Sequence, residues 1–89
     1  MRTTLTQKNL WPLALGDALL EARTGTGMSQ QELADRAGVH RTYISDVERG
    51  VRNVTVVTIL RMCSALNVTP SVFFRLAEKR LNARRLSNQ

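Results

Sequence analysis

The fold depends on one stretch, QQELADRAGVHRTYISDVER (residues 30–49), which has the pattern of two short helices joined by a tight turn. Ala34 is small enough for two helices to cross closely, and Gly38 suits a turn residue with a positive φ. Ile44 follows six residues later and directs an apolar side chain back toward the first of these helices. Together these placements predict a helix-turn-helix motif. The apolar seam between its helices is completed by Leu33, Ala37 and Val47.

The segment before the motif also follows a helical period. Pro12 suits the first turn of a helix, because its missing N–H has no partner to lose there. This helix should end near Thr24, since the glycines in TGTG (24–27) favour a turn. Apolar residues recur along it at the spacing of one buried stripe, at Leu15, Ala18 or Leu19, and Ala22.

Capping residues place the starts of the remaining helices. Ser29 and Glu32 have the spacing of a capping box, which fixes the start of the second helix. Thr55 can cap a fourth helix, and Thr69 with Pro70 can open a fifth. The fourth helix should bury Val56, Ile59, Leu60, Cys63 and Leu66 and stop at Asn67. The fifth carries Val72, Phe73, Phe74, Leu76 and Leu81. Without any strand alternation, the chain is predicted to be all-α with five helices.

Length and charge limit what the chain can do. Its 89 residues make one small domain with no room for a large catalytic cleft. Thirteen Lys and Arg against seven Asp and Glu give a formal charge of +6 and a pI near 11.1, which favours DNA, RNA or an anionic membrane as partner. No apolar run approaches the ~20 residues of a membrane span, and the amino terminus lacks a signal-peptide core. We therefore expect a cytoplasmic protein.

The sequence offers little chemistry for catalysis or metal binding. Cys63 is the single cysteine and falls in an apolar stripe, so a buried, inert thiol is expected. His40 is the single histidine, with no nucleophile or second ligand near it in the sequence. A carboxylate pair, a nucleophile beside a base and a glycine-rich phosphate loop are all missing. We predict no enzymatic activity, no cofactor and no metal.

The two ends of the chain differ from its middle. Residues 1–11 are polar and threonine-rich, and this flexible arm either frays or reaches DNA through Arg2 and Lys8. The helical domain then spans residues 12–84, and residues 85–89 form a C-terminal tail. Basic residues gather toward that end and form either a solvated helix face or a DNA contact. They are Arg75, Lys79, Arg80, Arg84 and Arg85.

The third helix, over about residues 40–49, presents a polar face suited to reading DNA. The major groove of B-DNA admits one α-helix, whose exposed side chains then meet the base edges. Arg41 can donate two hydrogen bonds to guanine O6 and N7. Thr42 can donate to a base or place its methyl group against thymine, whereas Ser45 can reach either a base or only a phosphate. The predicted base contacts are Arg41, Thr42, Ser45 and Asp46.

Asp46 is unusual on such a face, because DNA phosphates repel a carboxylate. It either accepts a hydrogen bond from cytosine N4 or holds an arginine in position. Arg49 lies three residues on, within helical reach, and Arg41 lies a little over one turn back. We favour the orientation of an arginine over the cytosine contact.

A second set of residues should bind phosphates and fix the register of the docked helix without reading sequence. His40 could instead cap the third helix, and Gln30 could simply be solvated. Tyr43 should be semi-buried and offer its hydroxyl to the backbone or to DNA. The predicted phosphate contacts are Gln30, His40, Tyr43, Arg49, Arg52 and Asn53.

From about Leu15 to Phe74 the chain resembles the lambda-repressor-like, xenobiotic-response-element class of helix-turn-helix proteins. The resemblance is carried by LLEAR (19–23), SQQELADRAGV (29–39), YISDVERG (43–50) and NVTPSVFF (67–74). Within that class, HRTYISDVERGVRN (40–53) most resembles the small controller proteins of restriction-modification systems. The resemblance implies a five-helix lambda-repressor-like domain, with an ion pair between Arg23 and Glu48 that locks the first helix against the third. The chain departs from the class at His40, where a serine cap is common.

The resemblance also implies a function. The protein would be a transcriptional regulator in the bacterial cytoplasm, associated with the nucleoid, that times expression of a restriction endonuclease and of itself. A domain of this size buries a modest interface on DNA, so a homodimer on a palindromic operator is expected. RNA polymerase is a further expected partner, and no small-molecule ligand or membrane is expected. The predicted dimer interface, on the fifth helix and the end of the fourth, contains Val68, Val72, Phe74 and Leu76.

Three other functions use the same parts. A phage- or plasmid-type repressor would share the whole domain. An antitoxin acts first by binding a toxin and would need a segment for that contact, for which only the basic tail is available. A non-specific nucleic-acid binder would lose affinity equally on all sequences when Arg41 is replaced, whereas a sequence reader would lose discrimination at one base pair per half-site.

Overall fold

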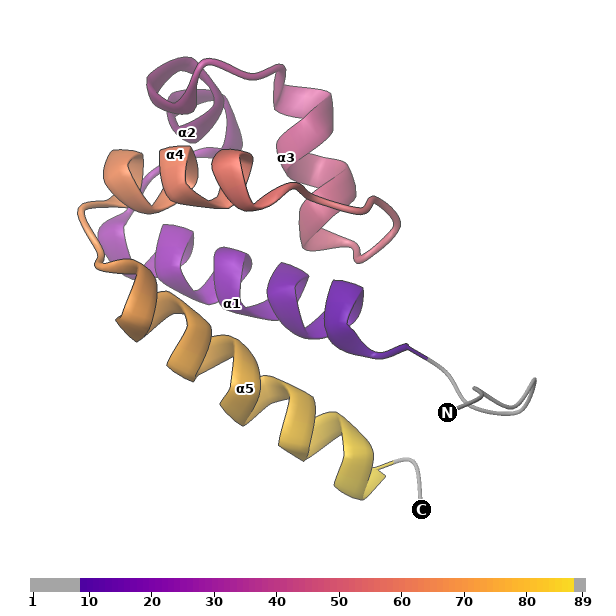
Figure 1. Cartoon of the computed structure of the whole chain (residues 1–89). Coiled ribbons are helices and arrows are strands. Elements are labelled where there is room, and N and C mark those ends of the chain that lie inside the picture. Colours follow the sequence, from indigo (N-terminus) through magenta and orange to yellow (C-terminus); the bar gives the residue numbers. More distant parts are fainter. Residues whose placement is uncertain (1–8, 88–89) are drawn as a thin grey trace.

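The computed structural model describes residues 9–87, and these form five α-helices (Figure 1). The predicted all-α class is confirmed. The helices are α1 (Trp11–Thr26), α2 (Gln30–Ala37), α3 (Arg41–Glu48), α4 (Val56–Leu66) and α5 (Pro70–Ser87).

The first helix runs through the middle of the molecule, with α5 along one side and α2, α3 and α4 on the other (Figure 1). The motif helices α2 and α3 pack against each other, α3 also packs on α1, and α2 also packs on α4. As a result α3 lies on the opposite side of α1 from α5 (Figure 1). The first turn of α3 carries exposed side chains.

Local capping explains most helix boundaries. The Ser29 hydroxyl accepts from the backbone N–H of Glu32, and the Glu32 carboxylate accepts from that of Ser29, so the predicted capping box is present. Gly38 ends α2 with φ 73°, in the left-handed conformation that the turn requires. Thr55 caps α4, and Asn67 ends that helix with φ 58°. The first helix runs to Thr26 rather than ending near Thr24, because Gly27 adopts the left-handed turn.

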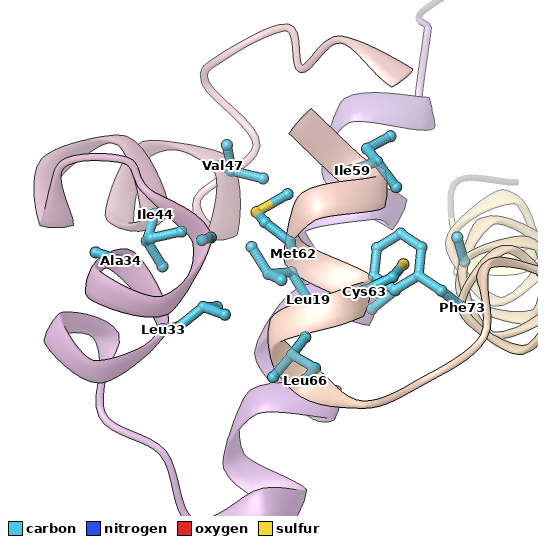
Figure 2. Packing of buried hydrophobic residues seen from close by; sticks show 13 residues of the cluster. Leu19, Leu33, Ala34, Ile44, Val47, Ile59, Met62, Cys63, Leu66 and Phe73 are labelled. Atoms are coloured by element: carbon cyan, nitrogen blue, oxygen red, sulfur yellow. The ribbon is translucent and has the colours of Figure 1, made fainter. Parts of the chain in front are cut away.

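The core joins the motif to α1, α4 and α5, and the predicted seam of the motif is confirmed (Figure 2). Its buried side chains include Leu33, Ala34, Ala37, Ile44 and Val47. Cys63 is buried as expected, and burial raises the pKa of its thiol, which favours the inert, protonated form.

The buried stripe of α4 is displaced from the predicted one. Val56 and Leu60 are 63% and 43% exposed, whereas Met62 is 1% exposed and sits between the motif and α1 (Figure 2). Both patterns share Ile59, Cys63 and Leu66, so helical period alone does not choose between them. The packing of α1, α2 and α5 against α4 determines which residues beside this stripe are buried.

One glycine sets how closely α1 and α3 approach. A Cβ atom added to Gly16 would lie 2.8 Å from the carbonyl oxygen of Glu48 and closer still to that of Val47. Both oxygens belong to the backbone at the end of α3, so neither can rotate away. The absence of a side chain at position 16 therefore allows the close approach of α3 to α1.

Two ion pairs fasten α5 to α1. Arg84 donates from Nε to Asp17 Oδ2 at 2.6 Å and from Nη2 to Asp17 Oδ1 at 2.9 Å, and Arg80 pairs with Glu21. The hydrogen bonds that Arg84 donates to Asp17 raise the pKa of Arg84. The helix continues through Ser87, so residues 85–87 are helical rather than part of the predicted tail. The ion pairs with α1 thus explain the presence of Arg80 and Arg84 in the basic run near the C-terminus, without any contact to DNA.

The ends of the predicted domain need one further correction. Trp11 already belongs to α1, and the rest of the predicted arm lies mostly outside the described residues, Arg2 and Lys8 included. Over residues 9–87 no single helix is long and apolar enough to cross a membrane; α4 and α5, bent by 108°, pass that test of length and composition only as a pair. The same part of the chain contains no group of side chains that could hold a metal ion.

Candidate nucleic-acid interface

The four predicted base-contact residues lie together on the outward side of α3. Ile44 and Val47 are buried and anchor the opposite side of this helix in the core. Arg41 and Thr42, in the first turn, are exposed, and Ser45 and Asp46, one turn later, are half-buried. The helix therefore presents a polar face of mixed donors and acceptors, with its amino-terminal turn the most accessible part.

A partly buried ion pair holds α3 from behind. Arg23 donates from Nε to Glu48 Oε2 at 2.6 Å and from Nη2 to Glu48 Oε1 at 3.0 Å, and these side chains are 12% and 5% exposed. Arg23 also donates from Nη1 to the carbonyl oxygen of Met28 at 2.8 Å. The hydrogen bonds that Arg23 donates to Glu48 raise the pKa of Arg23. The pair expected from the resemblance is present and ties α1, the start of α2 and the end of α3 together.

Gln30 connects this pair to Arg41, the first residue of α3. Its side-chain amide donates from Nε2 to Glu48 Oε1 at 2.9 Å, and its Oε1 accepts from Arg41 Nη1 at 3.3 Å. The bond to Glu48 fixes which end of the amide faces Arg41, because only the amide nitrogen can donate. Gln30 therefore positions the Arg41 guanidinium, a role that the sequence did not suggest.

Asp46 holds two arginines, and neither is Arg41. Its Oδ1 accepts from Arg49 Nη2 at 3.0 Å, and its Oδ2 lies 3.8 Å from Arg52 Nε. The Arg52 guanidinium carbon also lies 4.8 Å from the centre of the Tyr43 ring, in a cation–π contact. The loop after α3 brings Arg52 back over the helix, because Gly50 adopts φ 75° there.

The remaining predicted phosphate contacts frame this face. His40 is exposed and occupies the capping position of α3, but its side chain makes no capping hydrogen bond, so the alternative role of a side-chain cap is wrong. Asn53 is exposed and lines, with Arg52 and Trp11, a shallow hollow beside the start of α1. Val51 is 63% exposed in the same loop.

The predicted dimer residues lie away from α3. Val72 and Phe74 are 51% and 37% exposed on α5. Val68 and Leu76 are half-buried and pack partly against the core. The exposed pair leaves an apolar area at the start of α5, and Phe73 beside it is buried.

The fold and the outward face of α3 define a helix-turn-helix protein. The family model described as "Helix-turn-helix" matches residues 19–73, and the chain belongs to that family. Within it, the chain resembles the restriction-modification controller proteins. It is 51% identical over 45 residues to control protein C.BamHI of Bacillus amyloliquefaciens, a match that covers 51% of this chain and 56% of that protein. The chain thus spans little more than half the length of this curated relative.

Two solved structures are also similar. The controller protein C.Esp1396I, crystallised as a tetramer with its natural 35-base-pair operator, is 30% identical with a TM-score of 0.76; the match covers 82% of this chain and 96% of that one. The clp gene regulator ClgR of Corynebacterium glutamicum is 27% identical with a TM-score of 0.86; the match covers 92% of this chain and 87% of that one. These relatives are regulators rather than enzymes, which agrees with the prediction of no enzymatic activity.

Proposed function

We propose that this chain is a sequence-specific DNA-binding transcriptional regulator that acts as a homodimer on palindromic operators and controls a restriction-modification system. The observation that carries the proposal is the outward polar face of α3, because the residues predicted to contact bases lie on this face and not in the core. The Arg23–Glu48 pair and Gln30 support that face from behind. Such support fixes a reading helix before it meets DNA, so less ordering is needed on binding.

Each residue of the face has a proposed role. Arg41 donates both guanidinium hydrogens of its fork to guanine O6 and N7, a contact worth about 1–3 kcal/mol of base discrimination. Thr42 lies beside it and offers a hydroxyl and a methyl group to the next base. Ser45 and Asp46 follow one turn deeper and have a smaller reach, so they contact fewer base edges than Arg41 and Thr42.

The phosphate contacts surround this face. Arg49, Arg52 and Asn53 lie at the end of α3 and in the loop behind it, where they can meet one strand. His40 and Tyr43 flank the first turn of α3. Gln30 keeps a second amide hydrogen beyond the one given to Glu48, and this hydrogen can still reach a phosphate. These contacts would set the register of the helix in the groove.

A second copy of the chain is the proposed dimer partner. Val72 and Phe74 supply exposed apolar surface, and Val68 and Leu76 flank it from positions nearer the core. A two-fold dimer would place the recognition helices about 34–36 Å apart, one turn of the duplex. The tetramer of C.Esp1396I on its operator supports the binding of DNA by more than one copy of such a chain.

The similarity to C.BamHI and C.Esp1396I supports a controller of restriction-modification genes. We further propose RNA polymerase as a partner and the bacterial nucleoid as the place of action. A second candidate is a regulator of other genes, because the ClgR structure matches more of this chain than the C.Esp1396I tetramer does. The genes beside this one separate the two. A neighbouring restriction endonuclease gene supports the controller, whereas a toxin gene would support an antitoxin instead.

Selection from random duplexes tests the core of the proposal. We expect the wild-type chain to enrich a two-fold symmetric site with half-sites one helical turn apart. Arg41→Ala should relax one base pair per half-site, whereas Arg52→Ala should weaken binding to every sequence and flatten its salt dependence. Arg85→Ala removes the same charge from α5, on the other side of α1 from α3, and is the matched control. Failure of the wild-type chain to enrich any palindrome contradicts the proposal.

A further inference from the structure

We propose that Asp46 sets the ratio between specific and non-specific DNA binding by an exchange of ion pairs. In the free protein its carboxylate holds Arg49 and Arg52. On DNA the two arginines move to phosphates, and the carboxylate is left to accept from a base amine. This inference rests on the proposed function and adds a specificity-determining role to one of its residues. The groups involved are called here the Asp46 cluster and are Tyr43, Asp46, Arg49 and Arg52.

The geometry of the free protein places both arginines on one carboxylate. Arg49 donates to Asp46 Oδ1 at 3.0 Å, and Arg52 Nε lies 3.8 Å from Oδ2. The Asp46 side chain is 23% exposed, against 65% for Arg49 and 49% for Arg52. The carboxylate is thus the more buried member of the cluster, and the two guanidinium groups are the more accessible to a phosphate.

The ring of Tyr43 helps to fix the position of the Arg52 side chain in the free protein. Its centre lies 4.8 Å from the Arg52 guanidinium carbon, so this cation is held between an aromatic face and a carboxylate. Both contacts are partly exposed and are of the kind that a phosphate can replace, since an arginine binds phosphate through the same fork of donors. Binding to any duplex then requires the arginines to leave Asp46.

The exchange has a cost that depends on the base pair. Once its arginines have moved, the Asp46 carboxylate faces the groove without a cation. Cytosine N4 offers a donor to a carboxylate in the major groove, as adenine N6 also can, whereas guanine and thymine offer acceptors there. Every base pair carries one such amine, on the strand of its cytosine or adenine. A site that places the amine opposite Asp46 satisfies the carboxylate. A site that places it on the other strand leaves the carboxylate opposite acceptors and phosphates, so non-specific complexes are weakened more than specific ones.

The test is Asp46→Asn, which keeps the shape of the side chain and removes its charge. Affinities for the duplex selected by the wild-type chain and for a scrambled duplex are measured over a range of salt concentrations. We expect about tenfold tighter binding to the scrambled duplex, a smaller gain or a loss on the selected one, and a salt slope steeper by about one. Asp35→Asn is the control: it removes an equal charge from α2, where the carboxylate accepts from Gln31, and should leave the affinity ratio unchanged.

A second measurement follows the exchange without relying on the variant. In the free protein the Tyr43 ring should shift the side-chain NMR resonances of Arg52 upfield, because the guanidinium lies over the ring. Addition of either duplex should remove that shift. A shift that persists in the complexes overturns the exchange.

The outcomes separate the two proposals. A wild-type chain that distinguishes the duplexes, together with an unchanged ratio in Asp46→Asn, overturns the role of Asp46 and leaves the proposed function standing. Equal weakening on both duplexes shows a purely structural role and overturns it as well. A wild-type chain that binds both duplexes alike overturns the proposed function, and the role of Asp46 with it.

Discussion

Gly16→Ala should loosen the attachment of the recognition helix to the rest of the domain. The added methyl group would lie 2.8 Å from the Glu48 carbonyl oxygen and nearer to that of Val47, so α1 and α3 must separate. Overpacking costs about 1–3 kcal/mol, and clashes with backbone belong at the upper end. Alanine regains about 1 kcal/mol through its helix propensity. The net loss of stability should be about 2 kcal/mol.

Thermal and urea unfolding measure this loss. For a domain of this size, 2 kcal/mol corresponds to a fall in Tm of about 8–16 °C. Gly25→Ala is the matched control, because its Cβ would meet nothing within 4 Å and α1 continues past it to Thr26. This variant should gain up to about 1 kcal/mol. If Gly16→Ala were as stable as Gly25→Ala, the close packing of α1 on α3 would be refuted.

Three further predictions concern stability. Glu48→Gln leaves Arg23 facing no carboxylate in a largely buried site, and urea unfolding should show a loss of about 3 kcal/mol. Glu32→Gln should flatten the fall of stability between neutral and acidic pH, as measured by unfolding at several pH values, because the capping hydrogen bonds lower the pKa of Glu32. The double replacement Arg80→Ala with Arg84→Ala should cost about 1 kcal/mol at low salt and much less in 1 M salt, because both pairs are partly exposed.

The sign of the pH effect follows from the direction of the shift. The pKa of Glu32 is lower in the folded chain than in the unfolded one, so its stabilisation is complete above the unfolded value of about 4.3. It is lost as the pH falls through the folded value. Glutamine can fill the same capping position without titrating. Two results would contradict these assignments. One is a fall of stability at acidic pH that is as steep in Glu32→Gln as in the wild-type chain. The other is a loss of stability in the double variant of Arg80 and Arg84 that does not depend on salt.

The sequence was sufficient to predict those features that depend on residues close together in the chain. Ser29 and Glu32 lie within one turn and form their capping box whatever the rest of the chain does, and Gly38 is fixed by the turn it must make. The polar side of α3 could likewise be predicted, because Ile44 and Val47 leave only one face for the core. These features together fix the fold class and most of the candidate interface.

Contacts between residues that lie far apart in the sequence were harder to predict. The pattern of α4 allowed burial of either Leu60 or Met62 beside the same stripe, and only the packing of the neighbouring helices decides between them. Asp46 had two arginines within helical reach, but the loop at Gly50 supplies a third, Arg52. Gly16 was a lone glycine within a helical stripe, which signals a close approach without naming the partner.

The most direct test of the central claim is replacement of single guanines by 7-deazaguanine in the selected duplex. This change removes the N7 acceptor from the major groove and little else. We expect one guanine per half-site at which the replacement costs the wild-type chain about 1–3 kcal/mol of binding free energy and costs Arg41→Ala almost nothing. Tolerance of every replacement by the wild-type chain, or equal losses in both proteins, would contradict the docking of α3 in the major groove.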